Sequence, residues 1–338
     1  MLRSLSMSLG ARLLSRAFVC LLVLCTAQAA PAQPLRLMTG GAAKLIYLPV
    51  ILADRLGYFR REGLDVRIMS LPSGIDVSTE LVAGAIEGAV GYYDHVIALQ
   101  SRGMDVQSVI VLGQSAGVIE LASVANGIRT MADTKGRRLG VTGFGSSTYV
   151  LTRYLAKRAG LASDVYTVIP IAAEAAFERA ITSGDIDAGM TEEPTATHLL
   201  TRAVVRPVID LRGVADTRAQ LGGSYVGACI YMRREWIDAH PDETARLARA
   251  VRAALDFIKT HDQADIEAAV PESLKGGDRA AYHKALTIMK PAFSSTGRMP
   301  PDAPQTVLSI VADVDADVMP HHVDLTRTWT NRFVDAPR

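Results

Sequence analysis

Short apolar runs alternate with longer segments of helical periodicity along most of this chain, and this alternation restricts its fold more than any other feature. The runs expected to form strands are residues 35–39, 64–69, 88–91, 108–112, 139–142, 166–169, 188–191 and 225–232. The segments expected to form helices are residues 47–59, 73–85, 95–101, 146–159, 173–183, 194–201 and 242–261. Strands that alternate with helices of this length indicate βαβ units and parallel sheets.

The strand and helix series occurs twice, with a break around residues 113–127. The pattern therefore predicts an α/β protein of two lobes, each a parallel or mixed sheet flanked by helices, joined by two hinge crossings. We assign residues 34–116 with 227–338 to lobe 1 and residues 117–226 to lobe 2, with a helical C-terminal segment that returns to lobe 1. Glycines in both crossings, near residues 114–117 and 224–227, can absorb backbone rotation.

The N-terminus has the three parts of a secretory signal peptide. Arg3, Arg12 and Arg16 precede the uncharged apolar run 17–24, and Ala27-Gln28-Ala29 follows as a cleavage site. The apolar run is too short to span a bilayer, which takes about 20 residues. We therefore interpret residues 1–29 as a signal peptide and expect the protein in the periplasm.

The composition of the mature chain excludes nucleic-acid binding and an intrachain disulfide. Without residues 1–29 it has 33 basic and 35 acidic side chains, so it lacks the basic footprint of a nucleic-acid-binding protein. Cys20 and Cys25 are not preceded by the small residues of a lipoprotein signal, so we expect no lipid anchor. Cys229 alone cannot close an intrachain disulfide, so the fold has to be held by its own core.

Four short motifs follow one another along the chain. They read GYFRREGLDV at 57–66, LVAGAIEGA at 81–89, DTKGRRLGV at 133–141 and ITSGDIDA at 181–188. In this order they resemble the substrate-binding proteins of ABC importers, in the SsuA/THI5-like group that includes sulfonate, nitrate and thiamine-precursor binders. Glu87 stands where the group usually has Asp, and Thr134 stands where it usually has Leu.

This resemblance implies a periplasmic binding protein of type II that takes up a small, acidic organic ligand, for example in sulfonate, nitrate or taurine uptake. It also implies a monomer without a cofactor, with the ABC permease and its ATPase as separate chains. Two alternatives stay open: an enzyme of thiamine-precursor or menaquinone biosynthesis on the same fold, and a ligand-sensing subunit for a signalling partner. The export signal argues against the enzymes, which act in the cytoplasm.

Ligands of open α/β sheets bind outside the carboxyl ends of the strands, so the candidate ligand contacts are the residues that follow each strand. These candidates are Gly41, Lys44, Leu45, Tyr92, Tyr93, Asp94, Gln114, Ser146, Ser147, Thr148, Glu192 and Tyr225.

The run Ser146-Ser147-Thr148 is the sharpest of these candidates. Hydroxyl groups and free backbone N–H groups at a helix N-terminus form a cradle for carboxylate, sulfonate or phosphate. Members of the resembled group commonly hold ligand on this loop. Plain capping of the helix is the competing interpretation, because it uses the same residue types. A dinucleotide fingerprint is excluded, since it would need Gly at position 148.

The run Tyr92-Tyr93-Asp94-His95 could suggest a catalytic acid–base pair. No serine or cysteine nucleophile is marked for it, and no metal-ligand spacing occurs in the chain, so we expect neither a catalytic nor a metal site. We expect one tyrosine to face the ligand and the other the core. Asp94 could equally cap the following helix or contact the ligand.

Lys44 and the pair Glu192-Glu193 favour ligands of opposite charge. Lys44 favours an acidic ligand, whereas a carboxylate in the cleft favours a cation or a hydrogen-bond donor. Both glutamates could instead serve the following helix, whose N-terminus favours acidic residues. A ligand with an acid at one end and a donor at the other would satisfy both groups.

Overall fold

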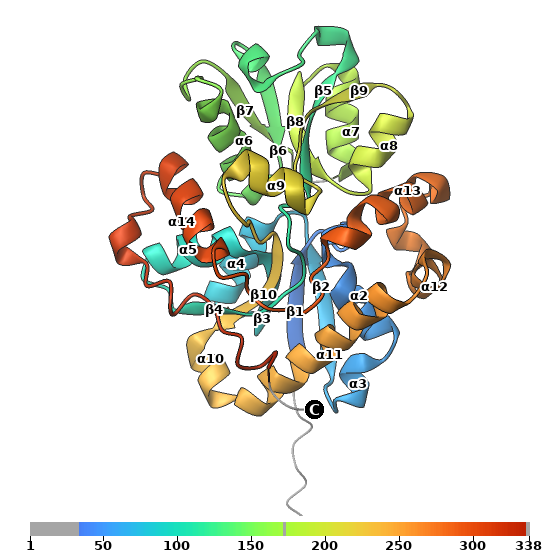
Figure 1. The fold of residues 1–338 in the computed structure, drawn as a ribbon, viewed down its shortest axis with the longest axis vertical. Coiled ribbons are helices and arrows are strands. Elements are labelled where there is room, and N and C mark those ends of the chain that lie inside the picture. The colour runs from blue at the N-terminus through green and yellow to red at the C-terminus, as the bar shows by residue number, and fades with distance from the viewer. Residues whose placement is uncertain (1–33, 172–173, 336–338) are drawn as a thin grey trace, which may run out of the picture. The chain divides into compact units, whose positions relative to one another are not determined.

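The strands form two five-stranded mixed sheets, as the alternation of strands and helices predicts (Figure 1). The computed structural model describes residues 34–171 and 174–335. From Leu35 onward the chain forms one compact unit. The signal peptide predicted at residues 1–29 lies outside the described residues.

The first sheet has the strand order β2-β1-β3-β10-β4. β10 is antiparallel to β3 and β4, and the other pairs are parallel. Its strands are β1 (Leu35–Gly40), β2 (Val66–Leu71), β3 (Gly88–Tyr92), β4 (Val106–Val111) and β10 (Ala228–Arg233). We refer to this sheet and its helices as the first lobe.

The second sheet repeats this arrangement with the order β7-β6-β8-β5-β9, and β5 is antiparallel to β8 and β9. Its strands are β5 (Val118–Ser123), β6 (Arg138–Val141), β7 (Thr167–Pro170), β8 (Ala188–Glu192) and β9 (Val205–Asp210). Together with its helices it forms the second lobe. The sequence pattern missed two of these strands. β5 lies inside the expected break at 113–127, where the buried Glu120 interrupts an apolar run, and Pro207 interrupts β9.

Helices cover both sheets, and most of them lie close to their predicted positions. The helices at 214–221 and 234–239 were not predicted. The first lobe has α2 (Leu48–Arg55), α3 (Tyr58–Arg61), α4 (Gly74–Val82), α5 (Tyr93–Ser101), α10 (Arg234–Ala239) and α11 (Pro241–Thr260). The second lobe has α6 (Ser147–Arg158), α7 (Glu174–Ser183), α8 (Thr195–Thr201) and α9 (Val214–Leu221). The helix expected at 47–59 is divided in two, because Gly57 has φ +73° between α2 and α3.

Two of the four sequence motifs place an acid at the same point of each sheet. Glu87 accepts a hydrogen bond from the backbone N–H of Arg36 in β1 at 2.7 Å and also pairs with its guanidinium. Asp187 accepts from the backbone N–H of Arg138 in β6 at 2.9 Å and pairs with that guanidinium. In each lobe the acid of the motif therefore links two neighbouring strands. This role is structural, and here Glu87 performs it in place of the usual aspartate.

The C-terminal helices contact both lobes. α12 (Gln263–Ala269), α13 (Arg279–Met289) and α14 (Ala303–Val314) follow α11. α13 packs against α8 and the short helix Leu45–Tyr47, and α14 packs against α5 and α6 (Figure 1). Lys157 of α6 and Asp313 of α14 form an ion pair at 2.6 Å. The C-terminal segment thus touches the second lobe as well as the first, and the exact lobe boundaries stay a prediction.

The two crossings between the sheets lie side by side. The backbone N–H of Gly227 in one crossing donates to the carbonyl of Ser115 in the other at 3.1 Å. A Cβ atom on Gly227 would lie 2.7 Å from the Ser115 carbonyl oxygen and 3.0 Å from that of Ala116. Only glycine therefore fits at position 227, between the two crossings, without a shift of the backbone.

We expect Gly227→Ala to lower the free energy of unfolding by about 1–3 kcal/mol, because the added methyl group presses on two backbone carbonyls. Gly113→Ala is the matched control, since its Cβ would lie 3.6 Å from the nearest atom, the Ala292 oxygen. Urea unfolding of both variants measures the difference. Equal stability of the two variants would mean that the crossings are not held this tightly.

Glu120 is a buried acid in the core of the second lobe. Its Oε2 accepts a hydrogen bond from Thr152 of α6 at 2.9 Å, and its Oε1 has no partner among the described residues. Burial raises the pKa of Glu120 to about 8. The carboxyl group therefore stays protonated in the folded protein at pH values where it ionises in the unfolded chain.

This difference makes stability depend on pH. Above about pH 4.5 the unfolded chain loses the Glu120 proton and the folded protein keeps it, so the free energy of unfolding falls as pH rises to about 8 and then levels off. The Glu120 contribution is on the order of a few kcal/mol. We expect Glu120→Gln to flatten this decline in urea unfolding between pH 5 and 8. A decline of the same size in the variant would assign it to other groups.

Candidate functional site

The lobes meet in a seam of buried polar side chains that come from the carboxyl ends of strands in both sheets. We call Lys44, Asp94, Ser147 and Glu192 the interlobe seam; the first two belong to the first lobe and the last two to the second. All four are at most 5% exposed. Polar groups buried this deeply cost free energy unless they are paired, so their partners decide what the seam can do.

Lys44 and Glu192 form an ion pair across the seam. Lys44 follows β1, Glu192 ends β8, and Lys44 Nζ lies 3.1 Å from Glu192 Oε1. Burial raises the pKa of Glu192 above that of an ordinary carboxyl group, and the charge of Lys44 opposes this rise. Next to the pair, the backbone N–H of Leu45 donates to the carbonyl of Glu193 at 2.9 Å.

Asp94 is the second link across the seam. Its Oδ1 accepts a hydrogen bond from Ser147 and its Oδ2 accepts one from Tyr225, both at 2.8 Å. The ring of His95 lies beside them, with Nε2 3.5 Å from Ser147 Oγ. Burial lowers the pKa of His95, and the nearby charge of Asp94 opposes this shift. Asp94 therefore uses both carboxylate oxygens to join the two lobes and the second crossing.

Two tyrosines lie between these links. Burial and the charge of Glu192 raise the pKa of Tyr47 and of Tyr92, and the charge of Asp94 adds to this in both. Both phenols are therefore protonated. The Tyr92 hydroxyl donates to the Ala116 carbonyl in the first crossing at 2.8 Å. Both rings belong to the hydrophobic core.

Two of the three hydroxyl groups predicted to hold an anion, those of Ser146 and Thr148, form hydrogen bonds within their own loop. Ser146 caps α6 and donates to the Gly143 carbonyl at 2.6 Å. Thr148 Oγ1 accepts from the backbone N–H of Thr142 at 2.9 Å. Only Ser147 reaches the other lobe. The capping interpretation therefore describes Ser146, and the three hydroxyls do not converge on one point.

Three other candidates lie away from the seam or at its edge. The Tyr93 hydroxyl bonds to Thr328 of the C-terminal segment, so this ring lies in the first-lobe core. Gln114 stands in the first crossing, where its backbone N–H donates to the Ala292 carbonyl at 2.8 Å. Gly41 has φ +106° in the turn after β1, and a Cβ atom there would lie 2.8 Å from Glu174 Oε1.

Sequence reasoning missed several residues at this site. Tyr47 was hidden inside an expected helix, and Glu174 begins α7 on the far side of the cleft. Arg212 pairs with the buried Glu193 at 2.5 Å and with Asp210 at 2.5 Å. No sequence signal marks the pair of Arg212 with Glu193, because the two residues are 19 positions apart in the chain.

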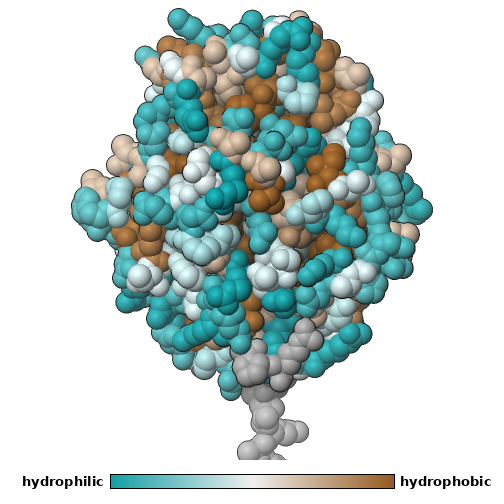
Figure 2. Space-filling model, viewed as in Figure 1, coloured by the Kyte–Doolittle hydropathy of each residue, from teal (hydrophilic) through white to brown (hydrophobic). Residues whose placement is uncertain are grey.

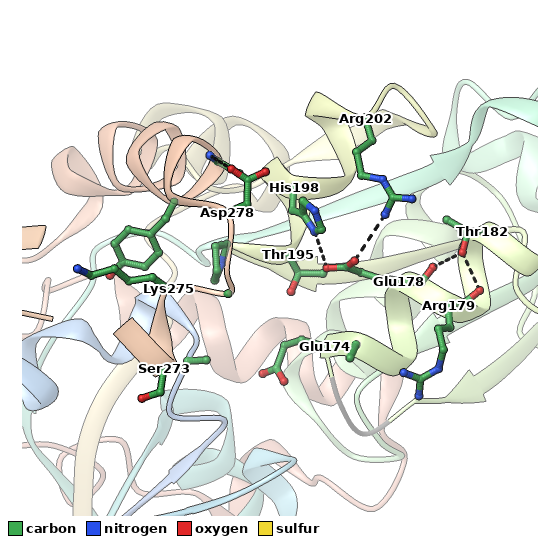
Figure 3. A pocket seen from close by; sticks show the side chains of 16 residues that line it. Glu174, Glu178, Arg179, Thr182, Thr195, His198, Arg202, Ser273, Lys275 and Asp278 are labelled. Atoms are coloured by element: carbon green, nitrogen blue, oxygen red, sulfur yellow. Dashed lines mark hydrogen bonds and ion pairs between the residues drawn. The ribbon is translucent and has the colours of Figure 1, made fainter. Parts of the chain in front are cut away.

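A cavity of about 600 Å³ is lined by Ala43, which precedes Lys44 in the chain, and by Pro194, which follows the Glu192-Glu193 pair (Figure 3). α7 and α8 form one wall, and the segment before α13 forms the other. A cavity of this size holds a small organic molecule.

Most charged groups around the cavity are already paired. Glu178 lies 2.9 Å from His198 and 3.8 Å from Arg202. Glu174 differs, because its Oε1 is buried and has no hydrogen-bond partner among the described residues. Figure 3 shows the Glu174 carboxylate pointing away from Glu178. Among the described residues that line the cavity, Glu174 therefore has a carboxylate oxygen that still lacks a donor.

Two other kinds of site are not supported. Within residues 34–171 and 174–335, no group of three or more histidines, cysteines, aspartates or glutamates is placed to hold a metal ion. In the same part of the chain, no helix combines the length and the apolar character that crossing a membrane requires.

Residues 46–264, more than half of the chain, match the family described as NMT1/THI5 like. The chain belongs to this family. One member, the 4-amino-5-hydroxymethyl-2-methylpyrimidine phosphate synthase of Schizosaccharomyces pombe, is 31% identical over 231 residues. The match covers 66% of this chain and 65% of that relative, slightly less than two thirds of its length.

Solved structures show the same fold as this NMT1/THI5-like chain. A protein of Bordetella bronchiseptica RB50 has a TM-score of 0.85 and 30% identity, over 89% of this chain and 95% of the other. The alkanesulfonate-binding protein SsuA of Xanthomonas axonopodis pv. citri has a TM-score of 0.71 and 17% identity, over 90% and 100%. The predicted type II periplasmic binding protein fold is confirmed.

We expect Lys44→Met to lower the free energy of unfolding by about 3 kcal/mol, because it leaves the Glu192 carboxylate buried without its cation. The control is Lys157→Met, which breaks the exposed pair with Asp313 and should cost less than about 1 kcal/mol. Urea unfolding at pH 7 compares the two variants. Equal losses would mean that the seam is hydrated in solution.

Proposed function

We propose that this chain is an extracytoplasmic solute-binding protein. It captures a small organic ligand between its lobes and delivers it to an ABC permease that is a separate chain. The observation that carries the proposal is the interlobe seam. Two lobes joined by two crossings meet there through buried polar side chains, beside a cavity of about 600 Å³. A ligand that enters would exchange its own hydrogen bonds for those that these side chains make across the lobes.

The charges at the cavity end of the seam favour a ligand that donates hydrogen bonds. Glu192 is paired with Lys44, whereas Glu174 has an unpartnered oxygen beside them. Acceptors that are buried and unpaired gain most from a charged or amide-like donor. Tyr282 lines the cavity and can pack against a flat ring. An amino-substituted ring with an acidic group at its far end meets these requirements.

The NMT1/THI5-like relatives support this ligand class. The relative from Schizosaccharomyces pombe is named for an aminopyrimidine phosphate, which combines a flat ring, an amino donor and an acid. The SsuA structure was solved with MOPS, a sulfonate, bound to it. An aminopyrimidine that bears an acidic group is therefore the first candidate ligand, and simple sulfonates, taurine and nitrate are the alternatives.

We also propose that the protein works in the periplasm as a monomer without a lipid anchor, after removal of residues 1–29. Apolar residues are scattered among polar ones on the face shown in Figure 2. The large hydrophobic side chains that are exposed among the described residues are Val82, Val124, Phe144 and Met319. Isolated residues of this kind are normal on a monomer.

A thermal-shift screen tests the binding function directly. It compares 4-amino-5-hydroxymethyl-2-methylpyrimidine and its phosphate with MOPS, taurine, nitrate and short carboxylates. A ligand at 100 times its Kd adds about 2.7 kcal/mol of stability, which raises the Tm by several degrees. We expect the aminopyrimidines to raise it and nitrate to leave it unchanged. No response to any compound would contradict the proposal.

Glu174→Gln tests the donor-binding end of the site. We expect it to weaken binding of the aminopyrimidine about tenfold or more, because a charged acceptor is lost. Glu178→Gln is the matched control, since Glu178 lines the same cavity but is already paired with His198. Isothermal titration calorimetry gives both affinities. Equal effects of the two variants would place the ligand elsewhere.

An enzyme is the second candidate, because the relative from Schizosaccharomyces pombe is named as a synthase. The contact of Ser147 with Asp94 and His95 provides groups that could move a proton. Mass spectrometry of the bound ligand after long incubation separates the two functions. Recovery of the unchanged compound supports binding, whereas a new product would favour catalysis.

A further inference from the structure

Another cavity lies where α6 of the second lobe packs against α14 of the C-terminal segment (Figure 1). Residues within 153–166 line one side of it, and residues within 312–316 line the other. We call it the α6–α14 cavity. Its volume is about 370 Å³, which is enough for a small organic molecule. It shares no lining residue with the interlobe seam or with the larger cavity, so it is a separate place in the molecule.

Arg153 of α6 lines this cavity, and its partners are phenols. Its Nη1 donates a hydrogen bond to the Tyr149 hydroxyl at 2.9 Å, and its Cζ lies 5.2 Å from the centre of the Tyr149 ring. Burial raises the pKa of Tyr166, which also lines the cavity, and the charge of Arg153 opposes this rise. Among residues 34–171 and 174–335, no carboxylate pairs with Arg153. Its guanidinium is therefore held in place without being neutralised.

The chemistry of a guanidinium selects what can bind there. Arg153 has five N–H donors and stays charged at all ordinary pH values. The hydrogen bond to Tyr149 uses one of these donors. A carboxylate suits the rest of the group best, because its two oxygens accept a parallel pair of hydrogen bonds and its charge neutralises the cation.

Apolar side chains line much of the remaining surface of the cavity. Leu161 belongs to one wall and Val314 to the other. Ala312 and Ala316 also line it, and their small side chains leave the space between the walls open. An apolar group that enters this space loses its contact with water, which favours binding. The α6–α14 cavity therefore combines one cation with apolar walls.

We propose that the α6–α14 cavity binds a small monocarboxylate with an apolar body, such as a benzoate or a short-chain fatty acid. The carboxylate pairs with Arg153, and the apolar body lies between Leu161 and Val314. This ligand contacts a helix of the second lobe and a helix of the C-terminal segment at once, so it stabilises their packing. The site goes beyond the proposed function, because the ligand held there is not the solute that the protein captures between its lobes.

The charges near the cavity are compatible with a carboxylate. Lys157 and Asp313 face each other from the two walls and neutralise each other at 2.6 Å. Asp164 and Asp317 lie close to the lining residues along the chain, and both are exposed, so solvent and salt screen their charge. Arg153 is therefore the group that decides which charge the cavity accepts.

Isothermal titration calorimetry with benzoate and with butyrate tests this site. We expect both carboxylates to bind the unmodified chain and Arg153→Met to weaken both about tenfold or more, because the charged fork is lost. Arg158→Met is the matched control, since Arg158 lies on the same helix and over the Tyr154 ring at 5.9 Å but does not line the cavity. The proposal is overturned if neither carboxylate binds or if the two variants bind benzoate equally well.

Ala312→Leu tests the location without a change of charge. The larger side chain fills the space between the walls, so we expect it to abolish benzoate binding while the Tm stays within a few degrees of that of the unmodified chain. Benzoate binding that survives in Ala312→Leu would place the ligand elsewhere and overturn the proposal. Neither Arg153 nor Ala312 belongs to the seam or to the larger cavity, so failure of this test leaves the aminopyrimidine screen intact.

Discussion

Burial of charge between the lobes is the constraint on which the rest of this structure depends. Lys44 and Glu192 lie in a region with little water, so each is tolerable only while the other is present. Asp94 depends in the same way on Ser147 and Tyr225. These contacts are lost when the two lobes move apart. Polar partners therefore help to hold the lobes together, alongside a hydrophobic core that contains buried residues of both lobes.

Such a seam gives the protein a means of selecting its ligand. A molecule that enters has to replace the contacts that the seam already makes, because any charge left without a partner costs more than the new contact contributes. Shape alone is then insufficient for binding. Among the described residues, Glu174 Oε1 is a buried atom without a hydrogen-bond partner, so a ligand can gain a bond there without first breaking one.

The sequence predicted the architecture far better than it predicted the site. Apolar periodicity indicated most strands and helices, because those patterns record which side of each element is buried. It missed β5, since the buried Glu120 makes that strand look like a loop. At the site, Lys44 and Glu192 could be named from their positions after strands, but nothing in the sequence indicates that they pair across 148 residues. Ser146 and Thr148 were drawn from the same rule and turned out to serve their own loop. Side-chain direction is set by packing between elements, which a local pattern does not contain.

The C-terminal helices also determine the order in which the parts of the protein fold. α13 and α14 contact helices of both lobes, yet they come after the strands of both sheets in the chain. Each sheet can form from residues that precede them, since β10 ends at Arg233. We therefore expect the two lobes to fold first as separate units. They become fixed relative to each other only when α13 and α14 pack against both of them. A chain that ends before α13 would have both sheets but would lack the two helices that hold the lobes together at the interlobe seam.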